Sequence, residues 1–268
     1  MGNERFIAGF DGTELFLKVS AVDNARALVI VVHGLCEHQG RYDYVAERLN
    51  EAGFTVYLFD HRGHGRSKGK SVYFNDFNEI VDDLHVVVTA AASENPGVPL
   101  FVLGHSMGGY AAALFGTKYP GLVKGILLSG ALTRYSMQSF GPLPMQGDPD
   151  SYLPNSLEAA ICSDSAVVEA YVNDPYVKKE ISVALCNSIG CGVDWLKENA
   201  GQFQYPVLVM HGANDSLVSE QDSRDFFGEI ASKDKGLLIF PGLLHEILNE
   251  PSRDDVLNHV IKWIGLRL

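Results

Sequence analysis

Six short, uninterrupted apolar runs constrain the fold of this 268-residue chain more than any other feature of its sequence. They alternate with helix-like segments and lie at residues 27–32, 55–59, 100–103, 125–128, 206–210 and 236–240. A strand without polar alternation is buried on both faces, so these runs predict a mostly parallel sheet that helices cover on both sides. We therefore expect an α/β fold with a doubly wound sheet.

The remaining elements follow from local patterns. Alternating apolar and polar residues on either side of Asp11-Gly12, at 6–10 and 14–19, predict an N-terminal antiparallel hairpin. Helices are expected at 42–52, 77–92, 107–118, 220–231 and 253–266. The last of these has Ser252 in position for an N-cap, and Asp255 lies near the positive end of its dipole.

The alternation of strands and helices breaks between Ser129 and Pro206. Such a gap is too long for a simple crossover connection and indicates an inserted cap. We expect residues 1–130 and 204–268 to form the core and residues 131–203 to form the cap, with helices at 165–172 and 177–186. Its apolar side chains could line an acyl channel or could only fill the core of the cap; they are Phe140, Leu143, Met145, Leu153 and Ile161.

Composition excludes several classes of function. A net charge of −12 without a basic stripe argues against nucleic-acid binding. The polar N-terminus and the lack of a long apolar stretch predict a cytoplasmic protein with no integral membrane segment. The four cysteines show no CxxC spacing, which favours free thiols over a disulfide framework. The oligomeric state stays open.

The pentapeptide GHSMG at residues 104–108 lies between an apolar strand and a helix. A strand, a sharp turn and a helix are the setting in which a nucleophilic serine is held above a sheet, and the flanking glycines permit that turn. Ser106 is therefore the candidate nucleophile. A serine hydroxyl is a weak nucleophile near neutral pH, so it needs a base within reach and an acid that orients the base.

Chain order and strand ends select the base and the acid. In this architecture the acid and then the histidine follow the serine, at the carboxyl ends of strands. His245 lies in the loop after the last apolar run, whereas His259 falls on the polar face of the C-terminal helix. Asp215 follows the run at 206–210, whereas Asp60 precedes the serine and is expected to order the turn at 62–65.

The tetrahedral intermediate of acyl transfer carries an oxyanion that two backbone N–H groups stabilise. One comes from the residue after the nucleophile and one from the loop after the first core strand, which are Met107 and Leu35. The neighbouring His33 is expected to be structural. Cys36 does not lie at a sharp turn between a strand and a helix, so it is a weak rival nucleophile.

Five motifs together resemble the monoacylglycerol lipase and lysophospholipase group of serine hydrolases. In chain order they are HGLCEH with GRY at 33–42, DHRGHGRS at 60–67, GHSMGG at 104–109, NDP at 173–175 and HGAND at 211–215. The resemblance implies an α/β-hydrolase fold with a cap, hydrolysis of fatty-acyl esters of glycerol, and the triad Ser106, Asp215 and His245.

The same resemblance implies that Glu37, Arg41 and Tyr171 lie near the glycerol end of the pocket. The chain departs from the animal enzymes at Leu248, where they carry a second histidine, so glycerol contacts are expected to differ. The cap offers little to match, which leaves chain-length preference open.

Several alternatives remain at this stage. The same triad would serve a lysophospholipase, or a carboxylesterase for short-chain or aromatic-acid esters, while a non-catalytic lipid-binding relative would be expected to lack a triad member. The P-loop-like stretch at 65–71 has one residue too few between its glycines, and the HE pair at 245–246 lacks the second histidine of a zinc helix. We expect a small-molecule lipid ester as substrate, transient contact of the cap with lipid, and no metal or cofactor.

Overall fold

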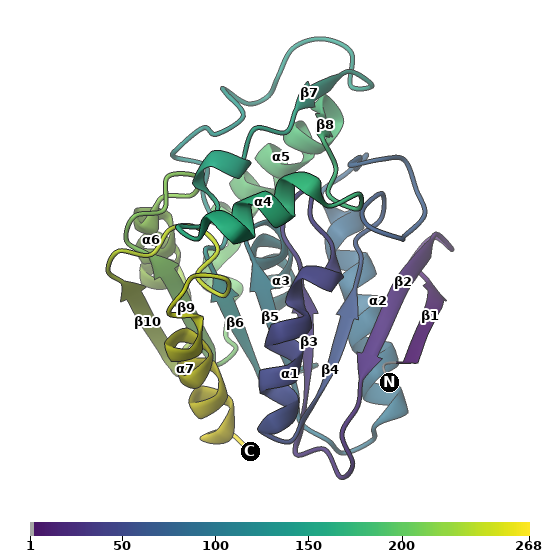
Figure 1. The fold of residues 1–268 in the computed structure, drawn as a ribbon, viewed down its shortest axis with the longest axis vertical. Helices are drawn as coiled ribbons and strands as arrows, with labels where there is room; N and C mark the ends of the chain where they lie inside the picture. The colour runs from purple at the N-terminus through teal and green to yellow at the C-terminus, as the bar shows by residue number, and fades with distance from the viewer. Residues whose placement is uncertain (1–2) are drawn as a thin grey trace.

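A computed structural model describes residues 3–268, in which eight strands form one sheet (Figure 1). The strand order is β1-β2-β4-β3-β5-β6-β9-β10. β1 (Asn3–Ala8) and β2 (Glu14–Ser20) form the antiparallel hairpin at one edge, and β2 pairs antiparallel with β4. The other neighbours pair in parallel. The predicted mostly parallel sheet with its N-terminal hairpin is confirmed.

Every apolar run of the sequence is a strand of this sheet. The strands are β3 (Ala27–Val32), β4 (Phe54–Phe59), β5 (Leu100–His105), β6 (Gly125–Ser129), β9 (Val207–Gly212) and β10 (Lys235–Phe240). All but β10 are buried at every residue. β10 is half-buried throughout because it is the last strand and has a neighbour on one side alone.

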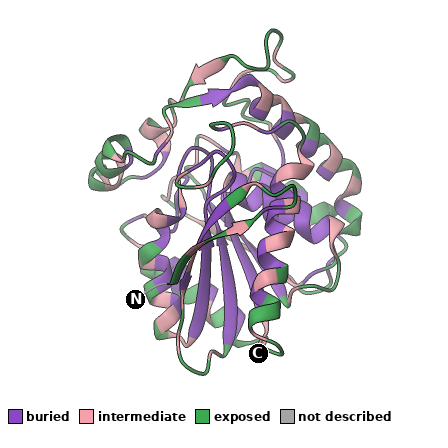
Figure 2. Ribbon diagram, turned by 90° about the vertical axis from the view of Figure 1, so that its right-hand side faces the viewer, coloured by how far each residue is buried: buried purple, intermediate pink, exposed green. Residues whose placement is uncertain are grey.

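Helices cover both faces of the sheet, which leaves the strands buried between them (Figure 2). Alternate side chains of a strand point to opposite faces, and β3 shows this directly. Ala27, Val29 and Val31 pack in the core cluster with α1 (Asp43–Glu51) and α7 (Arg253–Gly265). Leu28 and Ile30 belong to the opposite cluster, which includes α2 (Asn78–Glu94), α3 (Met107–Lys118) and α6 (Glu220–Glu229).

Residues 131–203, which we call the cap segment, lie across one end of the sheet (Figure 1). They contain β7 (Tyr152–Pro154), α4 (Ser165–Asn173), β8 (Glu180–Ser182) and α5 (Val183–Asn199). The helix expected at 177–186 is wrong at both ends, because the observed helix is α5, which begins at Val183 and ends at Asn199. Ile181 pairs with Leu153 in a two-stranded sheet, and the Ser182 hydroxyl caps α5 by accepting from the Leu185 N–H at 3.0 Å.

Two smaller points concern the start of the C-terminal helix and the lack of a membrane-spanning helix in the described residues. Ser252 occupies the N-cap position of α7, but its side chain makes no capping hydrogen bond, so that prediction is only half right. Asp254 and Asp255 do lie in the first turn, where the helix dipole favours negative charge. Among residues 3–268, no helix combines the length and apolar character that a bilayer crossing requires.

Candidate active site

Ser106 lies at a sharp turn between β5 and α3, in the backbone conformation φ 52°, ψ −118°. A residue with a side chain adopts a positive φ rarely, because its Cβ crowds the backbone. The flanking glycines allow the turn to pack. A Cβ on Gly108 would lie 2.1 Å from the Val32 carbonyl oxygen, and one on Gly104 would lie 2.3 Å from the Gly108 oxygen. The pentapeptide therefore folds as the strained elbow that its spacing predicts.

His245 and Asp215 meet through one short hydrogen bond. The His245 Nδ1–H donates to Asp215 Oδ2 at 2.7 Å, and the Asp215 side chain is fully buried. The N–H groups of Leu217 and Val218 donate to Asp215 Oδ1 at 2.8 and 3.0 Å. A carboxylate only accepts, so it holds the imidazole proton on Nδ1 and leaves Nε2 free to take a proton.

A second histidine, which the sequence analysis missed, also reaches Asp215. His211 is the penultimate residue of β9, and its Nε2 lies 2.9 Å from Asp215 Oδ2 and 2.9 Å from the Val218 carbonyl oxygen. Its Nδ1 accepts from the Ser223 hydroxyl at 2.7 Å. His211 and His245 thus contact the same oxygen of Asp215. Its spacing of four residues before Asp215, at a strand end, was the available signal.

The two partners shift each other's proton affinity. Burial raises the pKa of Asp215, but the adjacent His245 and the hydrogen bonds from His211 and His245 outweigh it and hold that pKa far below its usual value. Burial lowers the pKa of His245, but the Asp215 charge outweighs it and raises that pKa above 6.5. The arrangement stabilises an imidazolium, the form that a general base reaches after it accepts a proton.

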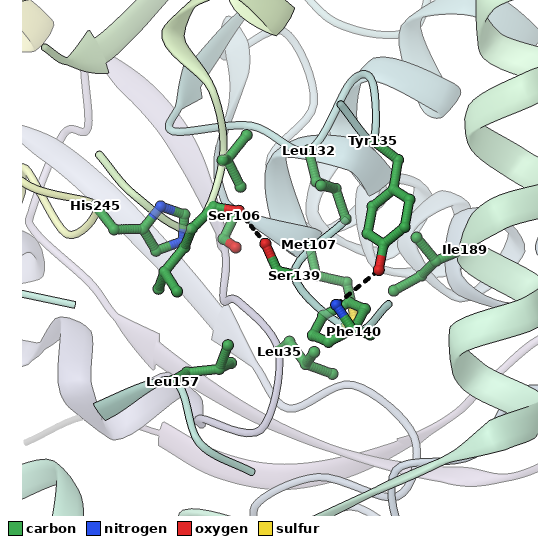
Figure 3. A pocket seen from close by; sticks show the side chains of 12 residues that line it. Leu35, Ser106, Met107, Leu132, Tyr135, Ser139, Phe140, Leu157, Ile189 and His245 are labelled. Atoms are coloured by element: carbon green, nitrogen blue, oxygen red, sulfur yellow. Dashed lines mark hydrogen bonds between the residues drawn. The ribbon is translucent and has the colours of Figure 1, made fainter. Parts of the chain in front are cut away.

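Ser106 and His245 line the same two cavities (Figure 3). One cavity is apolar, and the other is walled by Glu37, Tyr171 and other polar side chains. Within residues 3–268, the Ser106 hydroxyl makes no hydrogen bond to His245 or to another protein group. The serine and the imidazole are brought to one site, and proton transfer requires their further approach, as is common in unliganded sites.

Leu35 and Met107 supply two free backbone donors beside Ser106. Among the described residues, neither N–H finds a protein acceptor, and both residues line the apolar cavity. Gly34 makes this approach possible, because a Cβ there would lie 3.2 Å from the Ser106 Cβ and 2.8 Å from Glu37 Oε1. Two unpaired N–H groups at one wall of a cavity form an anion-binding arrangement.

The polar cavity ends in a buried charge network around Arg41. The guanidinium bonds Glu37 Oε2 through Nη1 at 2.6 Å, and it bonds Glu246 in a bidentate manner at 2.6 and 2.7 Å. It also stacks over the Tyr171 ring at 4.9 Å. Burial raises the pKa of Glu37, but Arg41 and further hydrogen bonds, including one from Tyr42, hold it below its usual value. Sequence reasoning missed Glu246.

Comparisons with known proteins agree with this geometry. The family described as serine aminopeptidase S33 (Hydrolase_4) matches residues 23–252. The chain belongs to this family of hydrolases. The monoacylglycerol lipase of Mycolicibacterium smegmatis is 37% identical over 98% of this chain and 96% of its own length. The monoglyceride lipase of Rattus norvegicus is 29% identical over 96% of this chain and 89% of its own.

Solved structures show the same relationship. A soluble variant of Saccharomyces cerevisiae monoglyceride lipase in complex with a substrate analogue matches with a TM-score of 0.89 at 25% identity, over 99% of this chain and 96% of its own. Paleococcus ferrophilus monoacylglycerol lipase matches at 0.84 and 28% identity, over 95% of this chain and 100% of its own. The α/β-hydrolase fold and the resemblance to the monoacylglycerol lipase group are confirmed.

The apolar side chains of the cap segment divide between the two roles that the sequence left open. Phe140, Leu153 and Ile161 line cavities next to or continuous with the Ser106 site. Leu143 packs against Gly190 in a separate groove, and Met145 pairs through its backbone with Asn187. The first three can therefore contact substrate, whereas the other two hold the cap segment together.

The apolar cavity at Ser106 is small, and a larger cavity adjoins it. Its volume is about 30 Å³, room for about one water molecule, whereas the adjoining cavity holds about 250 Å³. Both are lined by Ser139, Phe140, Leu157 and Leu217. These four side chains therefore separate the two cavities.

The rival groups are structural. Cys36 is buried, and burial raises the pKa of its thiol far above the usual value, so it holds no thiolate near neutral pH. Asp60 accepts from the Arg66 and Gln39 N–H groups at 2.7 and 2.8 Å and orders the turn as expected. His33 Nδ1 bonds the Gly34 carbonyl oxygen at 2.7 Å, which confirms its structural role.

Four buried histidines make this hydrolase sensitive to acid. Burial lowers the pKa of His64 and His105 to about 4, and it lowers that of His33 and His61 well below 6.5. Below pH 6.5 the unfolded chain therefore binds protons that the folded chain refuses, and stability falls as the pH falls. His64 and His105 should each cost about 2 kcal/mol at pH 5. His245 acts in the opposite sense, because its folded pKa is raised.

Urea unfolding at pH 7 and pH 5 measures this loss. We expect a clearly lower midpoint at pH 5. His64→Gln should reduce the difference between the two pH values by about 2 kcal/mol, whereas His259→Gln at an exposed position should leave it unchanged. Equal midpoints at the two pH values would contradict the assignment of these imidazoles as buried neutral groups.

Proposed function

We propose that this hydrolase cleaves monoacylglycerol into glycerol and a free fatty acid. Ser106 is the nucleophile, His245 the general base and Asp215 the residue that orients it. The observation that carries the proposal is the Asp215 Oδ2 to His245 Nδ1 hydrogen bond of 2.7 Å, which ends at the cavities that Ser106 lines. The relatives named above supply the substrate class.

The reaction divides into two displacements. The Ser106 oxygen attacks the ester carbonyl carbon while His245 Nε2 takes the hydroxyl proton. The resulting oxyanion accepts from the Leu35 and Met107 N–H groups. The carbon–oxygen bond to glycerol then breaks, and the imidazolium protonates the departing oxygen. In the second displacement, His245 deprotonates a water that attacks the acyl-enzyme, and the fatty acid leaves as Ser106 regains its proton.

We assign the two cavities to the two ends of this substrate. We assign residues 1–130 and 204–268 to the catalytic core and 131–203 to a cap. The larger cavity, lined by Phe140, Leu153, Leu157 and Leu217, takes the acyl chain. Glu37 and Tyr171 line the polar cavity, which takes the glycerol end, and Arg41 is bonded to Glu37. Leu248 is buried among apolar side chains, away from the glycerol contacts. Exposed apolar side chains on the cap, Met137, Val172 and Tyr176, support its transient contact with lipid.

Charge at the glycerol end favours a neutral head group. Two buried carboxylates, Glu37 and Glu246, face the single guanidinium of Arg41, which is already paired with both. His105 in the same wall stays neutral at pH 7, because burial lowers its pKa to about 4. Glycerol hydroxyls can donate to these carboxylates, whereas a phosphate would meet like charge. This arrangement favours monoacylglycerol over a lysophospholipid.

A substrate panel tests the proposal. We expect kcat/KM for 1-oleoylglycerol to exceed that for 1-oleoylglycerol 3-phosphate by about 100-fold, because a buried like charge costs several kcal/mol. Lysophosphatidylcholine and short p-nitrophenyl esters complete the panel. Glu246→Gln should reduce the ratio of kcat/KM for 1-oleoylglycerol to kcat/KM for its 3-phosphate by about tenfold. Glu47→Gln, at an exposed position on α1, should not change this ratio.

Two outcomes of the panel would redirect the assignment. Preference for the lysophospholipids would favour a phospholipase, the activity named for the Bacillus subtilis relative Phospholipase YtpA, which is 28% identical over 87% of this chain. Strong turnover of short esters with negligible turnover of 1-oleoylglycerol would identify a carboxylesterase.

A further inference from the structure

The loop that carries His245 is linked to the cap segment directly after the histidine and, through Glu250, before it. The Glu246 N–H, directly after His245, donates to the Ile161 carbonyl oxygen at 2.7 Å. The Leu244 N–H, directly before it, donates to Glu250 Oε1 at 3.0 Å. The same Glu250 oxygen accepts from the Ser163 N–H at 3.1 Å.

Glu250 is the centre of this connection. Its side chain is completely buried, and its second oxygen, Oε2, accepts from the Ser163 hydroxyl. One carboxylate thus joins the cap segment to the peptide that precedes the histidine. Cys162 adds a weaker contact from its Sγ to the Asn249 carbonyl oxygen at 3.5 Å. A buried carboxylate with three donors is costly to disrupt, because each loss leaves a polar group unpaired.

We propose that the contact between Glu250 and Ser163, which we call the latch, positions His245. The enzyme is then catalytically competent only when residues 161–163 of the cap segment are packed against the His245 loop. The inference rests on the proposed role of His245 as the base. When these cap residues are seated, both peptide neighbours of His245 are held, and the ring stays in line with Asp215. When they lift, the Glu246 N–H loses the Ile161 carbonyl oxygen and Glu250 loses both Ser163 donors, so the carboxylate that accepts from Leu244 is no longer fixed and the imidazole can turn away from Ser106. Glu250 is a positioning residue, since it acts on His245 through the backbone of Leu244.

The test removes the Ser163 hydroxyl, because Ser163 is exposed and we expect its loss to leave the fold intact. In Ser163→Ala we expect kcat to fall by about tenfold with KM changed less than twofold, on p-nitrophenyl acetate and on a soluble short-chain monoacylglycerol alike, because misplacement of a base slows chemistry. The low-field NMR proton on His245 Nδ1 should shift or broaden. Ser163→Thr retains a hydroxyl and should restore kcat to within about twofold.

Ser165→Ala is the matched control, because Ser165 is an exposed serine at the start of α4 and has no bond to the histidine loop. It should behave as the unchanged enzyme. Glu250→Gln should slow kcat as Ser163→Ala does, and the double variant should be no slower than the slower single variant, since both act on one link. An unchanged kcat in Ser163→Ala, or a loss confined to thermal stability, would overturn the latch.

The outcomes separate this inference from the proposed function. If the unchanged enzyme does not hydrolyse monoacylglycerol but Ser163→Ala lowers kcat on p-nitrophenyl acetate, the substrate assignment fails and the latch stands. If the unchanged enzyme hydrolyses monoacylglycerol and Ser163→Ala matches it in kcat, the latch fails and the substrate assignment stands.

Discussion

Replacing Ser106 with alanine is expected to lower kcat/KM for monoacylglycerol on the order of 10⁴- to 10⁶-fold while leaving the fold intact. The serine oxygen is the only atom that forms the covalent acyl bond in the proposed reaction. Alanine keeps the Cβ that already occupies the elbow, at φ 52°, so no new clash arises. Hydrolysis of 1-oleoylglycerol and circular dichroism of the variant measure the two effects.

Cys36→Ala is the matched control for this variant. Cys36 is the other nucleophilic side chain in the loops around Ser106, and its buried thiol is held protonated. We expect the control to keep more than about half of the activity, since loss of one buried sulfur is a modest packing change. Substantial hydrolysis by folded Ser106→Ala would refute the nucleophile.

Asp215→Asn is expected to reduce kcat by about 10³- to 10⁴-fold through the wrong histidine tautomer. The Leu217 and Val218 N–H groups need an acceptor at the Oδ1 position, so the asparagine oxygen stays there. Its NH₂ group then faces His245 Nδ1 and donates to it. Nδ1 becomes an acceptor, the ring proton moves to Nε2, and Nε2 can no longer take the Ser106 proton.

The same variant should move the pH profile. Activity needs a neutral imidazole, so kcat/KM of the unchanged enzyme rises with pH through the raised pKa of His245, above 6.5. Without the Asp215 charge, burial dominates and lowers that pKa, so the acid limb moves to lower pH. Asp222→Asn, a buried aspartate that accepts from Ser136, should keep the acid limb in place. An unmoved limb in Asp215→Asn would count against the His245 assignment.

Much of the site was open to prediction because the fold orders it along the chain. Parallel strands end at one edge of a sheet, so Ser106 after β5, Asp215 after β9 and His245 after β10 had to converge there. Close backbone packing at Gly108 explains why the elbow could be identified from local sequence. The predicted convergence of Asp215 and His245 is confirmed by their hydrogen bond; the catalytic roles remain a proposal that the variants above test.

The residues that were missed act across the fold. The roles of Glu246 and Glu250 depend on partners that lie far away along the chain, whereas His211 lies only four positions from Asp215. Glu246 is 205 positions from Arg41, and Glu250 is 87 positions from Ser163. The start of α5 was misplaced because the pairing of Ile181 with Leu153 overrode a local helical pattern.

The sequence by itself determined which elements follow one another along the chain. They are apolar runs that form strands, an elbow between two glycines, and an acid and a histidine at later strand ends. These depend on backbone sterics and on burial, which neighbours in the chain specify. Only the tertiary structure decided which charges face one another. A carboxylate buried beside Arg41, or shared between Ser163 and Leu244, is stabilised by distant donors, and no local pattern encodes their approach.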